Sequence, residues 1–311
     1  MPSTLARDEK ARARLVRMRE CVDHALSGVY GIREDLIPGA RLSALEATGE
    51  VSNCVMRPVV GVLLSGVKTL LTEDGSIRYG AGACYLIGIE QTGSFLFEKD
   101  AEGESLRSIS VMLDPQILRE LMTTAPVLQA SPGEFQGKRL GAYQVMEAPE
   151  TLAEAFVRLA DLAMHPEDVP VMAPLIIREI HYRLLTGPWR EALFSIFSRE
   201  GSVNRLARSI RWMTEHYSES FELAQVADMA HMSPATFNRH FRELMRESPL
   251  QYKRSVRLIM ARRFIETEGV TADEAAGRVG YKSVSQFHRD FKKRFGFTPG
   301  ESAGGPRAAA E

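Results

Sequence analysis

The chain has 311 residues, of which 44% are hydrophobic and 25% charged, so we expect two domains that each bury an ordinary core. No run approaches the roughly 18–20 uncharged apolar residues of a membrane helix, and the charged start of the chain contains no apolar signal region. These features favour a cytoplasmic protein with no membrane partner.

The net charge of −1 conceals an asymmetry along the chain. Residues 204–300 contain 17 Lys and Arg against 11 Asp and Glu, whereas the remainder contains 22 against 29. A basic C-terminal third on an acidic body is the electrostatic pattern of a nucleic-acid-binding module.

The N-terminal part predicts a helix followed by strands and then further helices. A helix is expected at residues 5–27, and glycine-punctuated β-type runs then predict a small barrel or sandwich over residues 36–115. The expected strands are 59–64, 67–71, 76–79, 83–87, 94–97 and 106–113, with a hairpin turn at Thr72–Gly75. Helices are expected at 150–164 and 166–185, where Gly187 and Pro188 stop the second one, and a short helix should follow Trp189.

An internal repeat in the basic segment is the strongest functional signal. Five positions recur at an offset of 50 residues: Ser233, Phe237, Arg239, Phe241 and Arg242 return as Ser283, Phe287, Arg289, Phe291 and Lys292. Upstream of each set lies a short apolar helix, Val226-Ala227 and Ala275-Ala276, at an offset of 49. Two helix-turn-helix (HTH) motifs are therefore predicted, at residues 223–244 and 271–294.

Each motif has the polarity of a recognition helix. Ser233 and Ser283 are suitable N-caps, and at about 100° per residue the two phenylalanines of each helix fall on one side and its basic residues on the other. Arg can pair with guanine edges or phosphates, and Asn with adenine. The long helix expected at 249–268 would hold the two recognition helices roughly 34 Å, or one DNA turn, apart.

Residues 204–302 also resemble the AraC/XylS-type DNA-binding domain. The resemblance is carried by Ser233-Pro234, Ser248-Pro249-x-x-Tyr252, Arg257-Leu258-x-x-Ala261-Arg262, Val279-Gly280-Tyr281 and Phe295-Gly296-x-Thr298-Pro299. One departure is His231, which stands where such domains commonly have glycine. A left-handed histidine there would be tolerable but strained, so the first turn is expected to differ slightly.

The resemblance assigns the DNA contacts residue by residue. Base readout is implied for Ala235, Asn238 and Arg239 in the first motif, and for Val284, Ser285, Gln286 and Arg289 in the second. Ala235 and Val284 offer only apolar contact, for example to a thymine methyl group. Phosphate contacts are expected for Arg242, Lys282, Lys292 and Lys293.

The N-terminal part resembles the N-terminal domain of one subgroup of the same family. Pro58–Lys68 and Arg178–Gly187 carry this likeness, which implies a cupin-like barrel followed by dimerising helices. The expected architecture is thus α+β, with a cupin-like sensor and dimerisation domain at 1–195, a linker at 196–203, an all-α DNA-binding domain at 204–302 and a disordered tail at 303–311.

Small-molecule sensing is the role expected of the barrel. None of the seven histidines lies between residues 25 and 164, so neither a metal site nor any other cofactor is expected, and we expect no enzyme activity. Candidate ligand-contacting residues are Met56, Tyr85, Phe95, Phe97 and Met112, although strand-borne aromatic residues also occur as plain core. Cys54 and Cys84 are candidate redox thiols, provided that they are exposed as thiolates.

Several alternatives stay open at this stage. The apolar stripe of the helix at 166–185 predicts either packing on the barrel or one half of a homodimer interface. A cupin enzyme with a DNA-binding domain and a nucleoid-associated protein without site specificity compete with a regulator. For a regulator the expected partners are a double-stranded operator, a second copy of the chain, an unidentified effector and, for an activator, RNA polymerase.

Overall fold

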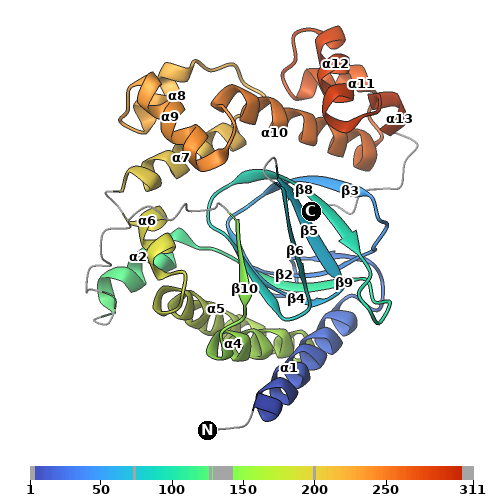
Figure 1. Ribbon diagram of the computed structural model, residues 1–311, viewed down its shortest axis with the longest axis vertical. Coiled ribbons are helices and arrows are strands. Elements are labelled where there is room, and N and C mark those ends of the chain that lie inside the picture. The colour runs from blue at the N-terminus through green and yellow to red at the C-terminus, as the bar shows by residue number, and fades with distance from the viewer. Residues whose placement is uncertain (1–3, 73–74, 126–127, 129–142, 199–200, 303–311) are drawn as a thin grey trace. The chain divides into compact units, whose positions relative to one another are not determined.

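The structure, a computed structural model, describes residues 4–72, 75–125, 128, 143–198 and 201–302 (Figure 1). The chain divides into two compact units. The N-terminal unit consists of most residues up to Gly201 and contains most of the strand residues. The C-terminal unit consists of residues 202 onward, which are helical, together with the short stretches Asn53–Met56 and Ile89–Gly93. The tail expected at 303–311 lies outside the described residues. None of the helices in the described part has an apolar stretch long enough to cross a bilayer.

The described strands form two sheets. They are β1 (Gly31–Arg33), β2 (Ala40–Leu45), β3 (Val51–Met56), β4 (Val59–Ser65), β5 (Val67–Thr72), β6 (Gly75–Gly80), β7 (Ala83–Ile87), β8 (Gln91–Glu98), β9 (Leu106–Met112) and β10 (Tyr143–Glu147). One sheet has the order β1-β2-β9-β4-β7-β10 and the other has the order β3-β8-β5-β6. Each strand predicted from the sequence is present, and β5 pairs with β6 in antiparallel register as the hairpin signal indicates. The hairpin's two central residues, 73–74, lie outside the described part.

The expectation of a barrel is corrected by this arrangement. The described strands form two separate sheets that do not close into a barrel. The chain passes from β4 in one sheet to β5 in the other through a single residue, Gly66. Gly66 has a φ of 75°, and a Cβ atom there would lie 2.8 Å from the Cα atom of Leu106. Only glycine combines that backbone angle with so close an approach, so the sharp corner separates the sheets.

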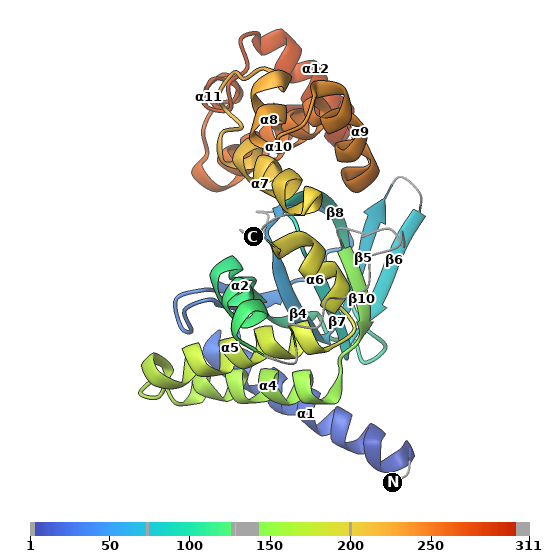
Figure 2. The same ribbon diagram turned by 90° about the vertical axis from the view of Figure 1, so that its left-hand side faces the viewer.

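Helices cover the six-stranded sheet. Helix α1 (Thr4–Ala25) packs on β2, β4 and β9 and on α4 (Glu150–Asp161), as Figures 1 and 2 show. Met18 and Val22 of α1 are buried, and Arg14 forms ion pairs with Glu150 and Glu154 at 2.7 and 2.9 Å. The predicted helix at 5–27 is confirmed within two residues at each end.

Helix α5 (Val169–Thr186) packs on α4 and carries the predicted apolar stripe. Its buried members include Ile176, Ile180 and Leu184, so this stripe is used inside the chain. The short 3-10 turn η1 (Leu162–Met164) precedes α5, and α6 (Arg190–Phe197) follows it. Helix α2 (Pro115–Thr124), which the sequence pattern did not predict, also packs on α5.

The C-terminal unit is a chain of short helices around one longer one. They are α7 (Ser202–Glu215), α8 (Leu223–Met229), α9 (Pro234–Met245), α10 (Pro249–Arg263), the π-helical turn η2 (Phe264–Glu268), α11 (Ala272–Arg278), α12 (Val284–Phe295) and α13 (Pro299–Ser302). Helix α10 with η2 covers the connecting helix predicted at 249–268. Figure 1 shows α10 running between the pair α8–α9 and the pair α11–α12.

Candidate nucleic-acid interface

The first HTH motif consists of α8, a tight turn and α9. The turn is closed by the amide of Met232, which donates to the carbonyl of Ala227 at 3.0 Å, and His231 has a φ of 53°. His231 is thus left-handed like Gly280 at the matching position of the second motif, which has a φ of 81°. Helix α9 begins as predicted: the Ser233 hydroxyl accepts from the Thr236 amide at 3.2 Å and so satisfies one of the helix's unpaired amides.

An aromatic core anchors α9. Phe237 and Phe241 are fully buried with their ring centroids 5.7 Å apart, and Phe241 lies edge-on against Tyr252 of α10 at 5.7 Å. The opposite side of α9 exposes Arg239 and Arg242. A helix locked by its apolar side presents its basic side with little freedom to rotate, which is what reading a groove requires.

The second motif repeats this construction with α11 and α12. The amide of Tyr281 donates to the carbonyl of Ala276 at 2.9 Å, Gly280 has a φ of 81°, and the Ser283 hydroxyl accepts from the Gln286 amide at 3.3 Å. Phe287 and Phe291 are fully buried with centroids 5.5 Å apart. This core also contains Leu258 and Ala261 of α10, so the connecting helix contributes to the second motif directly.

The outer faces contain the residues assigned to DNA contact. Nine of the eleven are exposed: Ala235, Arg239, Arg242, Lys282, Val284, Ser285, Arg289, Lys292 and Lys293. Asn238 and Gln286 are half-buried at the edges of their helices, as their flanking position predicts. Each motif thus gathers its assigned residues around the outer side of one recognition helix.

Side-chain hydrogen bonds orient the second recognition helix's outer face. The Gln286 side-chain amide donates to Asp290 at 2.8 Å, and the Arg289 guanidinium donates to the Gln286 oxygen at 2.7 Å. Asp290 also accepts from the Tyr281 hydroxyl at 3.1 Å and lies 3.6 Å from Arg254 of α10. Sequence reasoning missed Asp290 and Arg254, because nothing in the local pattern marks them as the supports of Gln286.

The first recognition helix has a simpler arrangement. Its Arg239 guanidinium lies 3.2 Å from Nε2 of His240, a neighbour in sequence that the motif analysis did not single out. Arg239 is exposed, and its guanidinium carries further donors besides the one in this contact.

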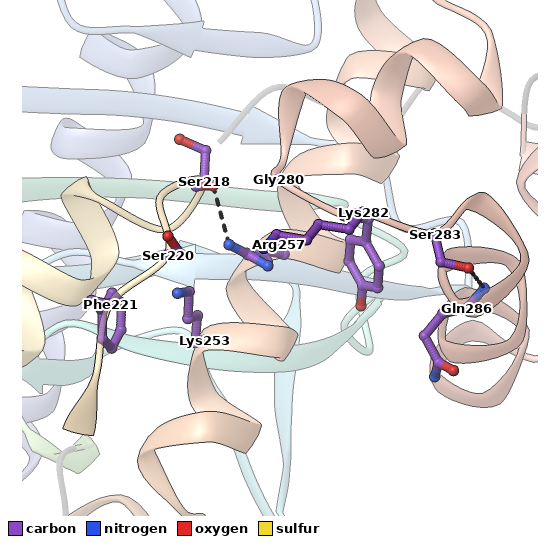
Figure 3. A pocket seen from close by; sticks show the side chains of 10 residues that line it. Ser218, Ser220, Phe221, Lys253, Arg257, Gly280, Lys282, Ser283 and Gln286 are labelled. Carbon is purple, nitrogen blue, oxygen red and sulfur yellow. Dashed lines mark hydrogen bonds between the residues drawn. The ribbon is translucent and has the colours of Figure 1, made fainter.

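A cleft of about 550 Å³ lies beside the second motif (Figure 3). Its walls are Ser218, Ser220, Phe221, Lys253, Arg257, Gly280, Tyr281, Lys282, Ser283 and Gln286. Arg257 donates to the carbonyl oxygens of Tyr217, Ser218 and Glu219 at 2.5, 3.1 and 3.0 Å. It therefore holds the segment that follows α7 against α10.

Lys253 has a similar structural use. Its ammonium donates to the Glu219 carbonyl at 2.5 Å and lies 3.7 Å from the centroid of the Phe221 ring. Burial, and secondarily the charge of Arg257, lowers the pKa of Lys253 to about 8. Both basic residues are tied to the protein's own backbone, so Lys282, which is exposed, is the cleft's candidate for a phosphate contact.

The expected ligand-contacting residues separate into two groups. Tyr85, Phe95 and Phe97 are buried and belong to one aromatic cluster with Tyr79 and Tyr143, with ring centroids 6.0–6.3 Å apart. Of the other two, Met56 is buried on β3 and Met112 is half-buried on β9. The cluster also surrounds the ammonium of Lys68, which sequence reasoning missed.

Comparison with known protein families decides the identity. Residues 36–192, half of the chain, match the family described as the AraC-type transcriptional regulator N-terminus, and residues 226–303 match a helix-turn-helix domain. The chain belongs to the AraC-type transcriptional regulators. It is a DNA-binding transcription regulator, and the resemblance seen in its sequence is confirmed in both parts.

Individual relatives agree with this assignment. This AraC-type regulator is 36% identical over 97 residues to the RCS-specific HTH-type transcriptional activator RclR of Escherichia coli, a match to 31% of this chain and 34% of RclR. It is 24% identical over 246 residues to the HTH-type transcriptional regulator ExsA of Pseudomonas aeruginosa, covering 79% of this chain and 86% of ExsA. The chain thus spans about a third of the first relative and most of the second.

A solved structure shows the same fold over most of the chain. ToxT from Vibrio cholerae, crystallised with an unsaturated fatty acid bound, aligns with 85% of this AraC-type regulator and 94% of its own chain, with a TM-score of 0.53. At 11% identity, the likeness concerns the fold alone.

The cysteines of this AraC-type regulator are buried. Cys84 is fully enclosed, and burial raises its pKa well above the ordinary value, while Cys54 is 7% exposed. Cys21 is also buried, and burial raises its pKa to about 11. A reactive thiol needs an exposed thiolate, so these surroundings disfavour the thiol switch considered for Cys54 and Cys84. In the described part of the chain, no group of three or more His, Cys, Asp or Glu side chains is placed to hold a metal ion.

Proposed function

We propose that this AraC-type regulator binds one specific double-stranded DNA site by placing α9 and α12 in successive major grooves. The observation that carries the proposal is the duplicated geometry: two serine-capped helices, each fixed by two buried phenylalanines, each with an exposed arginine side. The connecting helix between them is α10, and its helical form supports a fixed spacing of about one DNA turn between the two recognition helices.

Within this proposal the outer-face residues take two roles. Arg239 and Arg289 read guanine edges, Asn238 and Gln286 read adenine, and Val284 packs on a thymine methyl group. Ala235 and Ser285 line the same base-facing sides. The remaining basic residues, which hold phosphates and fix the position of the helices, are Arg242, Lys282, Lys292 and Lys293.

The test compares binding to the DNA next to the chain's own coding region with binding to a scrambled duplex of equal length, as the salt concentration rises. We expect a footprint with two protected segments, and specific binding that survives at salt concentrations where scrambled DNA is released. Arg239→Ala combined with Arg289→Ala should remove this preference, whereas Arg208→Ala, an exposed arginine of α7 outside both motifs, should retain it. If binding to the specific and the scrambled duplex weakens equally as the salt concentration rises, the chain is instead a non-specific, nucleoid-type DNA-binding protein.

Small-molecule control is the second part of the proposal. Support comes from the aromatic cluster inside the N-terminal unit and from the shared fold with ToxT, which was crystallised with a fatty acid. We assign the chain no catalytic activity and place it in the cytoplasm, with RNA polymerase as a partner if it activates transcription. The direct test is operator affinity of the full chain with and without candidate compounds.

We also propose a homodimer that pairs α5 with α5 of a second copy. The inward stripe of α5 is used within the chain, but Val171 and Leu175 on another side are 66% and 59% exposed. In an antiparallel pair centred between them, Arg178 of one copy, which also holds Glu120 of its own chain at 2.9 Å, would face Asp168 of the other. Leu175→Glu should yield a sedimentation mass of one chain, and the control Val29→Glu, at an exposed residue outside α5, should retain the dimer.

A further inference from the structure

The inner side of the N-terminal unit contains one lysine among aromatic rings. Lys68 lies on β5, where its register partners are Tyr79 on β6 and Phe97 on β8. Residues paired across strands share a face of the sheet, and side chains alternate along each strand. Phe95 and Phe97 are buried whereas Ser94 and Leu96 between and beside them are half-buried, so this face is the inner one.

The facing sheet supplies the rest of the enclosure. Tyr85 on β7 pairs with Val145 on β10 and with Gly61 on β4. A Cβ atom at Gly61 would lie 2.5 Å from the Tyr85 ring, so the glycine makes the space that this ring occupies. Tyr143, two residues before Val145 on the same face, stacks on Tyr85 at 6.2 Å with an interplanar angle of 3°.

The Lys68 ammonium is held against these rings. It lies 3.9 Å from the centroid of Phe95 and 5.5 Å from the centroids of Tyr85 and Phe97. The hydroxyl groups of Tyr79 and Tyr143 hydrogen-bond to each other in the same cluster. One cation is therefore bordered by three ring faces from two sheets.

Lys68 is half-buried, so its ammonium is only partly shielded from water. The acid nearest in sequence on the neighbouring strand, Glu98, points to the outer face, where it contacts Thr69 at 3.4 Å and Arg78 at 3.5 Å. Among the described residues no carboxylate forms an ion pair with Lys68. Ring faces compensate only part of the hydration that this half-buried ammonium loses, so an anion beside Lys68 would gain a charge-assisted interaction.

We infer that this cluster recognises the carboxylate of a small aromatic acid, with Lys68 as the counter-ion and the rings of Tyr85, Phe95 and Phe97 as the walls around its flat body. The inference rests on the small-molecule control proposed above and names the chemical class of the effector. A neutral molecule of the same shape would leave the ammonium without a counter-charge, and a cation would be repelled by it.

The test uses the purified full chain and two probes of matched shape, 2-naphthoate and 2-naphthamide, with benzoate and benzamide as a smaller pair. Titration calorimetry should show each acid binding at least about tenfold more tightly than its amide, because a hydrogen bond to a charged group is the stronger kind. Lys68→Met should abolish the preference for the acid, and Lys68→Arg should restore part of it. Lys99→Met, at an exposed lysine of the same unit, should leave it unchanged.

Three results would overturn the inference: no binding of either acid, equal binding of acid and amide to the natural chain, or a preference for the acid that survives in Lys68→Met. Lys68→Gln serves as a second neutral variant if Lys68→Met fails to give a native circular-dichroism spectrum. The comparison of acid with amide on the natural chain requires no variant at all.

Operator binding separates this inference from the function on which it rests. If the acid binds through Lys68 but leaves operator affinity unchanged, the recognition inference stands and effector control is contradicted. If a neutral compound changes operator affinity equally in the natural chain and in Lys68→Met, effector control stands and the carboxylate inference is contradicted.

Discussion

The two HTH motifs have left-handed backbone angles at the same two positions but use different residue types there. Each has one left-handed residue in its turn and another at the end of its recognition helix. The first motif uses His231 and Arg246, with φ of 53° and 63°, and the second uses Gly280 and Gly296, with φ of 81° and 85°. A left-handed angle alone therefore does not demand glycine in this fold.

The surroundings explain where glycine is required. At Gly280 a Cβ atom would overlap the carbonyl oxygen of Ser218, which belongs to the segment after α7, whereas at Gly296 a Cβ atom would meet nothing within 4 Å. His231 is exposed, so its side chain has room despite the strained backbone. Packing against the neighbouring segment therefore requires glycine at position 280, whereas at position 296 only the left-handed backbone angle favours glycine.

The largest effect should come from the aromatic core of each motif. Phe241→Ala and Phe287→Ala each remove a fully buried ring, so each should lower the free energy of unfolding by ~3–5 kcal/mol. Urea denaturation followed by circular dichroism measures both losses. If one variant loses far less than the other, the two cores are not equivalent as the repeat implies.

Replacing each of the two glycines by alanine should separate the cost of steric overlap from the cost of the left-handed backbone angle. Gly280→Ala adds a steric overlap to an unfavourable left-handed angle and should cost about 2–4 kcal/mol of unfolding free energy. Gly296→Ala meets no neighbour and should cost only about 1 kcal/mol. Equal losses in the same denaturation experiment would mean that the Ser218 contact is unimportant.

The outer faces of α9 and α12 should differ in how strongly their affinity for DNA depends on the side chains beside their arginines. Arg239→Ala and Arg289→Ala should each weaken operator binding by ~1–3 kcal/mol. Gln286→Ala should also weaken it, because Gln286 orients Arg289 in the second motif, whereas His240→Ala should change it little. Fluorescence anisotropy with a labelled operator measures these changes, and an unaffected Arg289→Ala variant would show that α12 does not read bases.

The smallest effect should be a gain. His231→Gly removes a strained left-handed side chain from the first turn and should raise the free energy of unfolding by roughly 0.5–1 kcal/mol. A loss of stability would indicate instead that the histidine side chain makes a contact that outweighs the strain. Arg246→Gly at the end of α9 offers the matched comparison.

The sequence predicts the HTH motifs well because their information is local. A serine cap and phenylalanines four residues apart define each recognition helix within about twenty consecutive residues, with a proline after the cap in the first motif, and the structure has α9 and α12 within a residue of the expected bounds. Strands β4 to β9 were likewise predicted, since β-branched runs between glycines mark them.

Features that depend on distant partners were missed. Strand β10 is recognisable only through its pairing with β7, and β1, β2 and β3 are short or weakly patterned. The separation into two sheets follows from the corner at Gly66, whose role lies in its contact with Leu106 rather than in any local motif. The cluster around Lys68 depends on the register of five strands, β5, β6, β7, β8 and β10, which the sequence pattern does not specify.

The segment between α7 and α8 should tolerate little change in its own length. Its carbonyl groups at 217–219 are held by Arg257, and Lys253 also donates to the last of them, while Ser218 fills the space that only a glycine at 280 leaves open. One residue inserted or deleted here would shift every one of these carbonyls out of line. Surface connections of a regulator ordinarily drift in length between relatives, but this one should be as intolerant of insertions as a core strand.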